Sequence, residues 1–553
     1  MTLGAVLPGL AQEQKELPPV LPFSPPDSVA RRQDRPQLEL PEVLVYGRDT
    51  SLRLPGEKLT VEHPPAVPLR ETWAATADTG AAAIREELFA GGRPSLHWLS
   101  VRLEGGSYWT ANGEARYRKS AGRLTYGAGM SFRRSDGAVD NGHYAILGLG
   151  GQVAYPLPER GTVEAHLSLT QADYGLAGAT LPDTARALQA QRHAMAASVG
   201  TRAEVGVARD GRLTICYDYS SLRSSDDTLT ARLGRLAADL HRLETTASVR
   251  VGRSDVFGRI GYLGEGYRSG GAQKSRWNSF VQAEGGISGD VLGYGRVYLA
   301  LGLHGFSWPG EGWTSGFAAT ARLGLATSPK MGWTLELRRA YDYRPLGDRS
   351  AENPYYAPDL ELQPVRTNFA CTVGAEWQLA PDLVLVARAG RAWLQDQWYW
   401  QREPATGLFT TGVVPKLKLS YGTLALRYVP NSRLDIEARC LLWRDSFRLE
   451  QWPRAADAPY LAHRRLPVTV SYRLGDRTRI ELSSDVISSR CAEISSQTKL
   501  APYTLLGCVI THQLGKRCVI LVRGENLTNS KYERWQGYGE MGLRILAGGF
   551  ARW

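Results

Sequence analysis

Apolar and polar residues alternate one by one along most of the chain from about residue 94 onward. Between 434 and 442, apolar residues at even positions alternate with the charged residues Asp435, Glu437 and Arg439. The segments 332–338 and 477–486 show the same alternation. Because successive side chains of a β-strand point to opposite faces, each segment predicts a strand with one apolar and one charged face.

Ten short turn signals divide this region at intervals of roughly 35 to 52 residues. Each contains Gly, Pro, Asn, Asp or Ser, which supply the backbone angles that tight turns need. The signals lie at 120–123, 158–161, 209–212, 252–255, 288–290, 328–332, 380–382, 430–432, 474–477 and 514–517. Longer polar or aromatic connections fall between them, at 342–365, 397–412, 451–464 and 528–540.

Short turns that alternate with long loops are typical of outer-membrane barrels. Ten turns at one end imply about 22 strands, and about 21 residues per strand suffice for a span of ~10 residues and a connection. We therefore predict an all-β fold, a transmembrane antiparallel β-barrel of about 22 strands over residues 94–553. Such a barrel would be surrounded by outer-membrane lipid.

The N-terminal region lacks this alternation. Residues 1–11 combine a short apolar run with a small-residue end, and we interpret them as the remnant of a signal peptide. Residues 12–93 form a proline-rich arm, since 11 of the 30 prolines lie in 13–69. Such a segment is extended and semi-rigid. The Ala/Glu/Arg-rich segment 69–89 predicts a short helix at the barrel entrance.

One apolar, β-prone patch interrupts the arm and consists of Glu42, Val43, Leu44, Val45 and Tyr46. An exposed short strand of this kind can add to the sheet edge of a partner protein. It can equally pack against the wall or mouth of the chain's own barrel. The residues alone leave both interpretations open.

The composition agrees with a barrel and excludes several other classes. The chain has 59 Gly, 25 Tyr and 15 Trp, and it contains no run of about 18 apolar residues, which excludes transmembrane helices. The net charge is +11, but the basic residues are scattered rather than clustered, which argues against a nucleic-acid partner. No HExxH, P-loop, GxSxG or EF-hand string occurs, and the six cysteines show neither a CxxC pair nor zinc spacing. We therefore expect no enzyme activity, no metal and no cofactor.

Two groups of residues are candidates for recognition. Trp398, Tyr399 and Trp400 fall in a predicted outside loop, where they could stack on a sugar or another ligand or belong to an interfacial aromatic girdle. The second group consists of charged side chains expected to face the lumen, with a slight cationic excess that would favour anions weakly. The alternative is a wall whose charges neutralise each other. This group contains Arg338, Arg439, Arg479, Glu481, Asp485, Arg517 and Arg523.

The C-terminal part of the chain contains three stretches with distinctive motifs. Residues 526–533 (NLTNSKYE), the Gly537-Tyr538 pair and the strand that ends in Arg552-Trp553 resemble the final hairpin of TonB-dependent outer-membrane receptors. Residues 362–374 and 501–506 (APYTLL) resemble two further strand entries. The resemblance implies a bacterial outer-membrane location. The terminal aromatics Phe550 and Trp553 resemble the signal that the barrel assembly machinery reads.

The same family has an N-terminal plug, whose RG, DG-(V/I)-P and E-V-x-R-G-P hallmarks do not occur here. The resemblance therefore implies a barrel without its plug, and residues 42–45 resemble the TonB box that contacts a periplasmic partner, TonB or another protein. Two functions follow as expectations. One is a passive or partner-gated channel for polar solutes. The other is an outer-membrane anchor that displays loops outside and docks a periplasmic partner through its arm.

Overall fold

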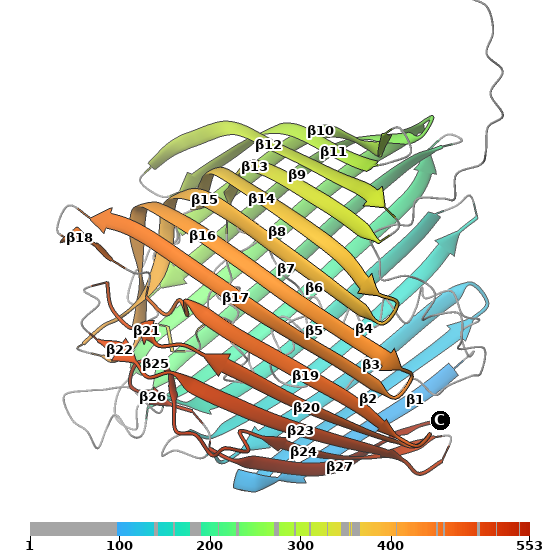
Figure 1. Ribbon diagram of the computed structural model, residues 1–553, viewed down its shortest axis with the longest axis vertical. Helices are drawn as coiled ribbons and strands as arrows, with labels where there is room; N and C mark the ends of the chain where they lie inside the picture. Colours follow the sequence, from blue (N-terminus) through green and yellow to red (C-terminus); the bar gives the residue numbers. More distant parts are fainter. Residues whose placement is uncertain are drawn as a thin grey trace, which may run out of the picture.

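The computed structural model describes residues 97–553 with short gaps (Figure 1). The gaps are 138–141, 159–160, 177–189, 208–209, 228–231, 270–275, 292–294, 309–310, 329, 344–352, 354, 357–364, 405, 450–451, 457–458, 495–497, 516 and 541. The predicted signal-peptide remnant, the arm with its short helix and the Glu42–Tyr46 patch lie outside the described residues.

Twenty-two strands form the wall. They are β1 (His97–Gly106), β2 (Thr110–Ala121), β3 (Leu124–Ser135), β4 (Tyr144–Leu157), β5 (Gly161–Gly175), β6 (Gln191–Val207), β7 (Gly211–Asp227), β8 (Arg232–Val251), β9 (Ser254–Ser269), β10 (Arg276–Val291), β11 (Gly295–Trp308), β12 (Glu311–Ser328), β13 (Met331–Asp342), β14 (Val365–Ala380), β15 (Leu383–Arg402), β16 (Phe409–Asn431), β17 (Leu434–Leu449), β19 (Arg464–Leu474), β20 (Thr478–Ile487), β23 (Tyr503–Gln513), β24 (Cys518–Glu525) and β27 (Arg544–Arg552).

Smaller elements lie in the connections. They are the 3-10 turn η3 (Ser107–Trp109) and the strands β18 (Trp452–Ala456), β21 (Arg490–Cys491), β22 (Lys499–Leu500), β25 (Glu533–Trp535) and β26 (Tyr538–Gly539). No helix among the described residues is long or apolar enough to cross a membrane.

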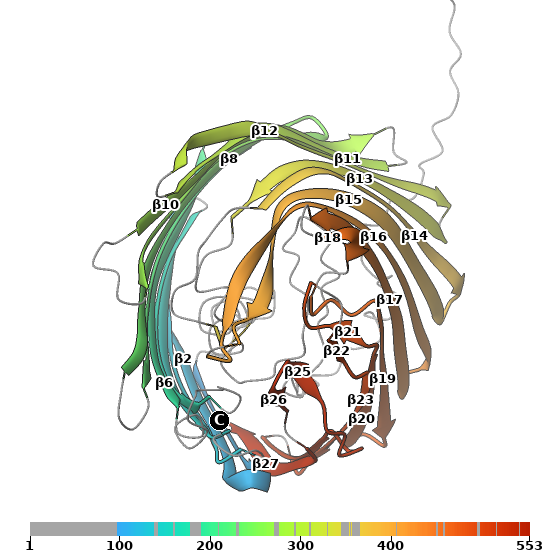
Figure 2. The same ribbon diagram turned by 90° about the vertical axis from the view of Figure 1, so that its left-hand side faces the viewer.

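Neighbouring wall strands pair antiparallel, and the last strand closes on the first (Figure 2). At this seam β1 pairs with β27 from Ser100 opposite Arg552 to Gly106 opposite Leu546. Leu99 and Trp553 exchange two backbone hydrogen bonds, with N···O distances of 3.1 and 2.9 Å. The predicted closed antiparallel barrel of 22 strands is confirmed.

The alternation of the sequence becomes the two faces of this wall. Large apolar side chains are exposed on the outside, and Leu303 on β11 keeps 63% of its surface accessible. Their neighbours along the strands point inward, where Glu104, His304 and Arg523 are buried. An apolar outer face and a polar inner face are what a barrel in lipid requires.

The two ends of the barrel differ. One end carries the ten short turns together with His97 and Trp553, and we call it the turn end. The opposite end, the loop end, carries η3 and all five small strands (Figure 1). Its connections are short around much of β1–β12, such as 107–109 and 309–310, and long between β13 and β27, such as 343–364 and 526–543.

Candidate functional site across the loop end

The hairpin of β15 and β16 continues beyond the wall and bends inward over the lumen (Figure 2). The two strands pair up to Arg402 opposite Phe409, but the ladder skips Asp396 and Pro415, which face each other. Pro415 has no backbone N–H to donate, and Asp396 adopts a left-handed φ of 54°. A break on both strands at one level gives the hairpin its bend.

The tip of this hairpin reaches the opposite wall. Leu408 is buried in an apolar cluster with Tyr144, Ile146 and Tyr174, which belong to β4 and β5. In a ring of 22 strands, β5 and β16 are eleven positions apart, so they lie diametrically opposite. The hairpin therefore crosses the lumen from side to side.

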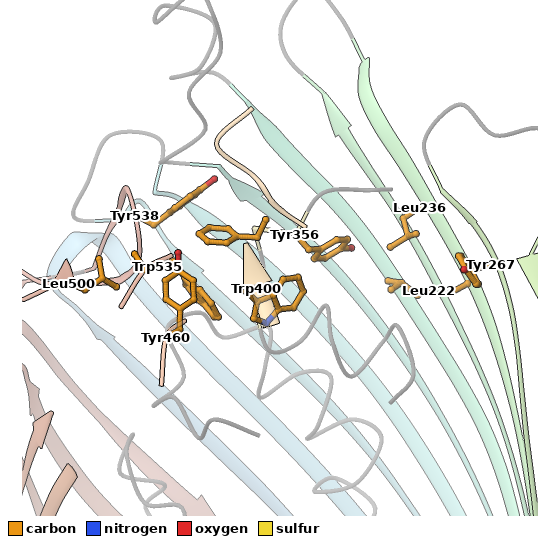
Figure 3. Close-up of a cluster of buried hydrophobic side chains, with 12 residues drawn as sticks. Leu222, Leu236, Tyr267, Tyr356, Trp400, Tyr460, Leu500, Trp535 and Tyr538 are labelled. Atoms are coloured by element: carbon orange, nitrogen blue, oxygen red, sulfur yellow. The ribbon is translucent and has the colours of Figure 1, made fainter. Parts of the chain in front are cut away.

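An aromatic cluster holds the hairpin near its tip (Figure 3). Trp400 is only 3% exposed, and its ring meets that of Trp535 edge-on at 6.2 Å between centroids. Phe409 packs against Trp535 at 5.3 Å and against Tyr460 at 5.7 Å. Such pairs contribute about 0.5–1.5 kcal/mol each beyond their burial. The cluster also includes Leu222 of β7, so it joins residues from both sides of the barrel.

The segment around Tyr355 and Tyr356 links the hairpin to the far wall. The Phe409 N–H donates to the Tyr355 carbonyl at 2.9 Å, and Tyr356 forms a parallel bridge with Phe409. The Tyr355 ring stacks on Tyr538 at 3.7 Å between centroids. Burial raises the pKa of both Tyr355 and Tyr356, so these phenols stay neutral in the packed interior.

A buried ion pair anchors this segment to β6 and β7. Arg192 donates from Nε and Nη2 to the two carboxylate oxygens of Asp226, both at 2.5 Å. The same guanidinium donates to the Tyr356 carbonyl at 2.6 Å and lies over the Tyr356 ring at 4.0 Å. The Arg192 residue is fully buried, so removal of one partner would leave an uncompensated charge.

The connection between β24 and β27 carries a second buried polar group. The Arg490 side chain donates to the Glu533 carbonyl at 2.6 Å, and Arg534 lies 3.8 Å from Glu540. Burial raises the pKa of the Glu540 carboxyl, although Arg534 acts in the opposite direction. Burial lowers the pKa of Arg490. Arg534 directly precedes Trp535 of the aromatic cluster in β25. The same connection contacts the hairpin tip, where the Tyr538 hydroxyl donates to the Gly407 carbonyl at 3.1 Å.

The structure corrects the placement of Trp398, Tyr399 and Trp400. They belong to the inward part of β15 rather than to an outside loop, and they pair with Val413, Gly412 and Thr411 of β16. Trp400 lies in the cluster that spans the lumen, so it is not part of an aromatic girdle against lipid. The long 397–412 connection was mispredicted because its strand pairing continues past the wall.

Several of the predicted lumen charges form ion pairs. Arg439 donates from Nε to Glu437 at 2.6 Å, and Arg479 lies 2.9 Å from Glu481. Asp485 accepts from Arg465 at 2.8 Å. These pairs favour the interpretation in which the charges of the inner wall neutralise each other over the one in which excess cations attract anions.

The three remaining predicted lumen charges lie in different parts of the barrel. Arg523 bridges Glu104 and Glu525, both at 3.1 Å, and so ties β24 to β1. Arg338 lies on β13. Arg517 is exposed in the turn between β23 and β24, so it is outside the strand wall.

The predicted assembly residues lie on and beside the last strand. Phe550 is opposite Arg102 at the seam, and Trp553 follows β27 with 55% of its surface exposed. No sequence signal singled out Arg192 or Leu408, because their partners are remote in the chain. Aromatics in the connections, Tyr355-Tyr356 and Trp535, were the signal available for the cluster.

Comparison with known proteins shows similarity in structure. No protein-family model matches the chain, and no curated protein matches its sequence. The FrpB iron transporter from Neisseria meningitidis has a TM-score of 0.68 at 9% identity, covering 85% of this chain and 83% of its own. The siderophore receptor PiuA from Acinetobacter baumannii scores 0.64 at 10% identity, over 83% and 82%. The copper transporter OprC scores 0.68 at 11% identity, over 83% and 80%. The chain therefore has the barrel fold of these receptors and transporters. The apolar outer face of the wall supports the predicted location in the bacterial outer membrane.

Proposed function

We propose that the protein is a gated outer-membrane channel for polar solutes, closed at its loop end by the β15–β16 hairpin. The fold shared with iron and copper transporters supports transport as the class of function. The polar inner wall supports a polar cargo. Passage requires the hairpin to leave the far wall, so the channel is gated rather than constantly open.

The observation that carries this proposal is the tether of the hairpin to both walls. Leu408 packs on β4 and β5, and Tyr356 is held by Arg192 and Asp226 of β6 and β7. A surface loop that only displayed an epitope would not need a buried ion pair inside the barrel. A closed gate needs such contacts, because they must oppose the entropy of a free hairpin.

We further propose that the N-terminal arm, through Glu42–Tyr46, docks a periplasmic protein such as TonB, which would supply the gating force. Support comes from the position of His97, where the arm joins the barrel at the turn end beside Trp553. In an outer-membrane barrel, short turns face the periplasm. The barrel assembly machinery would recognise the terminal strand with Phe550 and Trp553.

An outer-membrane anchor that docks a periplasmic partner remains the second candidate. The bridged lumen favours it, because an anchor needs no open path. Both candidates would use the same arm. They differ in whether the lumen can open to let a solute pass.

Conductance in planar lipid bilayers tests the proposal. Residues 398–413 are replaced by Asn-Gly, which can close the hairpin because Gln397 and Val414 are directly paired. The wild type should show rare, small openings, and the shortened variant should show steady openings of several-fold larger conductance. The matched control is Arg223→Gln, which alters an exposed outward ion pair.

The anchor predicts a different result. If the shortened variant is as silent as the wild type, and also remains silent when residues 13–93 are deleted, the channel proposal is wrong. A rise in conductance that occurs only after the arm is removed would show that the arm, rather than the hairpin, closes the channel.

A further inference from the structure

The outward faces of three adjacent strands end in basic residues at the loop end. On β17 the outward series Leu434, Ile436, Ala438, Cys440 and Leu442 is followed by Arg444. On β19 the series Leu474, Tyr472, Val470, Val468 and Leu466 is followed by Arg464. On β16 the outward series from Tyr428 reaches Lys418 and then Lys416.

The position of these cations matches the boundary of the apolar band. Lys418, Arg444 and Arg464 each lie ten residues from the outward residue nearest the turn end, namely Tyr428, Leu434 and Leu474. At about 3.3 Å per residue and a tilt of roughly 40°, this spans about 25 Å, the height of the lipid-facing band of such barrels. The cations therefore lie where acyl chains give way to headgroups.

Strand register brings the basic side chains together. Ser420 of β16 is paired with Arg391 of β15 on one side and with Arg444 of β17 on the other. Lys418 is one pleat further along β16, diagonal to both arginines, at a spacing of about 7–8 Å. Arg464 is paired with Leu442, which places it diagonal to Arg444. Arg391, Lys416, Lys418, Arg444 and Arg464 are all exposed, and we call them the outer basic patch.

The outer basic patch carries no acidic partner among the described residues. This distinguishes it from outward charges elsewhere at the loop end. On β7 and β8, Arg223 lies 2.8 Å from Asp239, and on β6 and β5, His193 lies 2.5 Å from Asp173. The Arg223–Asp239 pair neutralises itself, and His193 is hydrogen-bonded to Asp173, whereas the outer basic patch leaves several positive charges at the lipid boundary. Clustered cations there need anions from outside the chain.

We propose that the outer basic patch binds the phosphate groups of a glycolipid in the outer leaflet, the acylated, bis-phosphorylated glucosamine disaccharide that anchors lipopolysaccharide. Apolar rows below the patch receive the acyl chains, and guanidinium and ammonium groups meet the phosphates. Trp393 supports this arrangement, since it is paired with Lys418 and lies 5.1 Å from the Arg391 guanidinium. The proposal is independent of the gate.

Titration of the detergent-solubilised protein with bis-phosphoryl lipid A tests this. The triple variant Lys418→Gln/Arg444→Gln/Arg464→Gln should bind roughly 100-fold more weakly, since each basic residue near an anionic lipid contributes about a factor of five. The control is Arg134→Gln/His193→Gln/Arg223→Gln, which changes three outward side chains that have acidic partners in the structure. The control should bind as the wild type does.

Two results would overturn the proposal. One is unchanged lipid A affinity in the first triple variant. The other is a wild-type affinity for phosphatidylglycerol equal to that for lipid A, which would mean a general attraction to anionic lipid. Folding of each variant is checked by its heat-modifiable mobility in gels. If the triple variant does not fold, two other measurements decide the question. The single variant Arg444→Gln should bind lipid A more weakly than the wild type does, and the wild type should not bind fully dephosphorylated lipid A.

Discussion

The two halves of the barrel wall are built from the same kind of strand but differ in what they add to it. From β1 to β12 the loop end carries mostly short connections, and outward charges such as Arg223 and Asp239 are paired. From β13 to β27 long connections fold inward, and the outer basic patch is left without described partners. The inner wall of the first half forms the surface on which the loop-end segments of the second half pack. Strand pattern therefore determines the barrel, and connections determine what it can do.

The seam where the halves meet should respond most strongly to substitution. A Cβ at Gly548 would lie 1.9 Å from the Leu103 carbonyl oxygen, a backbone atom of the facing strand, whereas a Cβ at Gly258 would meet nothing within 4 Å. Overpacking costs about 1–3 kcal/mol even where neighbours can move. Gly548→Ala should greatly reduce the yield of folded, heat-modifiable protein, and Gly258→Ala should not. Equal yields would show that the seam is not tightly closed.

The buried tether comes next. Asp226→Asn leaves Arg192 without its countercharge, which should destabilise the closed hairpin by about 3–5 kcal/mol. Asp239→Asn, on the outward side of the adjacent strand, should cost at most about 1 kcal/mol because its partner Arg223 is exposed. Hydrogen exchange at 402–409 should accelerate in the first variant alone. Similar exchange rates in both variants would show that the buried inner ion pair does not hold the hairpin more firmly than the exposed outer pair does.

The aromatic cluster allows a comparison between two tryptophans. Trp400→Ala should weaken the closed hairpin by about 3–5 kcal/mol, the usual cost of truncating a buried aromatic. Trp377 faces outward from β14 with 47% of its surface exposed, and its replacement by Ala should leave exchange in the hairpin unchanged. Protection of 402–409 that survives Trp400→Ala would contradict the role of the cluster.

The smallest effect concerns pH. The pKa of Glu540 is raised by burial, so the folded loop end binds its proton more tightly than the unfolded chain does. The resulting stabilisation is complete below the ordinary value of 4.5 and is lost as the pH rises through the folded pKa. Thermal unfolding of the loop end, followed by tryptophan fluorescence, should therefore shift upward slightly on acidification. Glu540→Gln should weaken the dependence of the unfolding temperature on pH. An unchanged dependence would show that another titratable group causes it.

The sequence predicts the wall well because alternation is a local property. The outward rows of β17 and β19 can be read directly from positions 434–444 and 464–474. The bend of the hairpin is only half visible, since Pro415 is evident in the sequence but the left-handed Asp396 is not. The contact of Leu408 with Tyr144 depends on closure of the whole ring, which no local pattern encodes. Charges that alternate along a strand likewise do not reveal which of them form pairs across strands.

The crossing of the lumen can be measured directly by double electron–electron resonance between two spin labels, in a variant that lacks the six native cysteines. One label replaces exposed Pro404 near the hairpin tip, and the second replaces either His193 on β6 or Lys418 on β16. If the hairpin crosses to the far wall, the 404–193 distance is the shorter of the two, because Leu408 packs in the same cluster as Ala194. A hairpin that continues straight out of its own wall would give the reverse order, with the label at 404 far from β6.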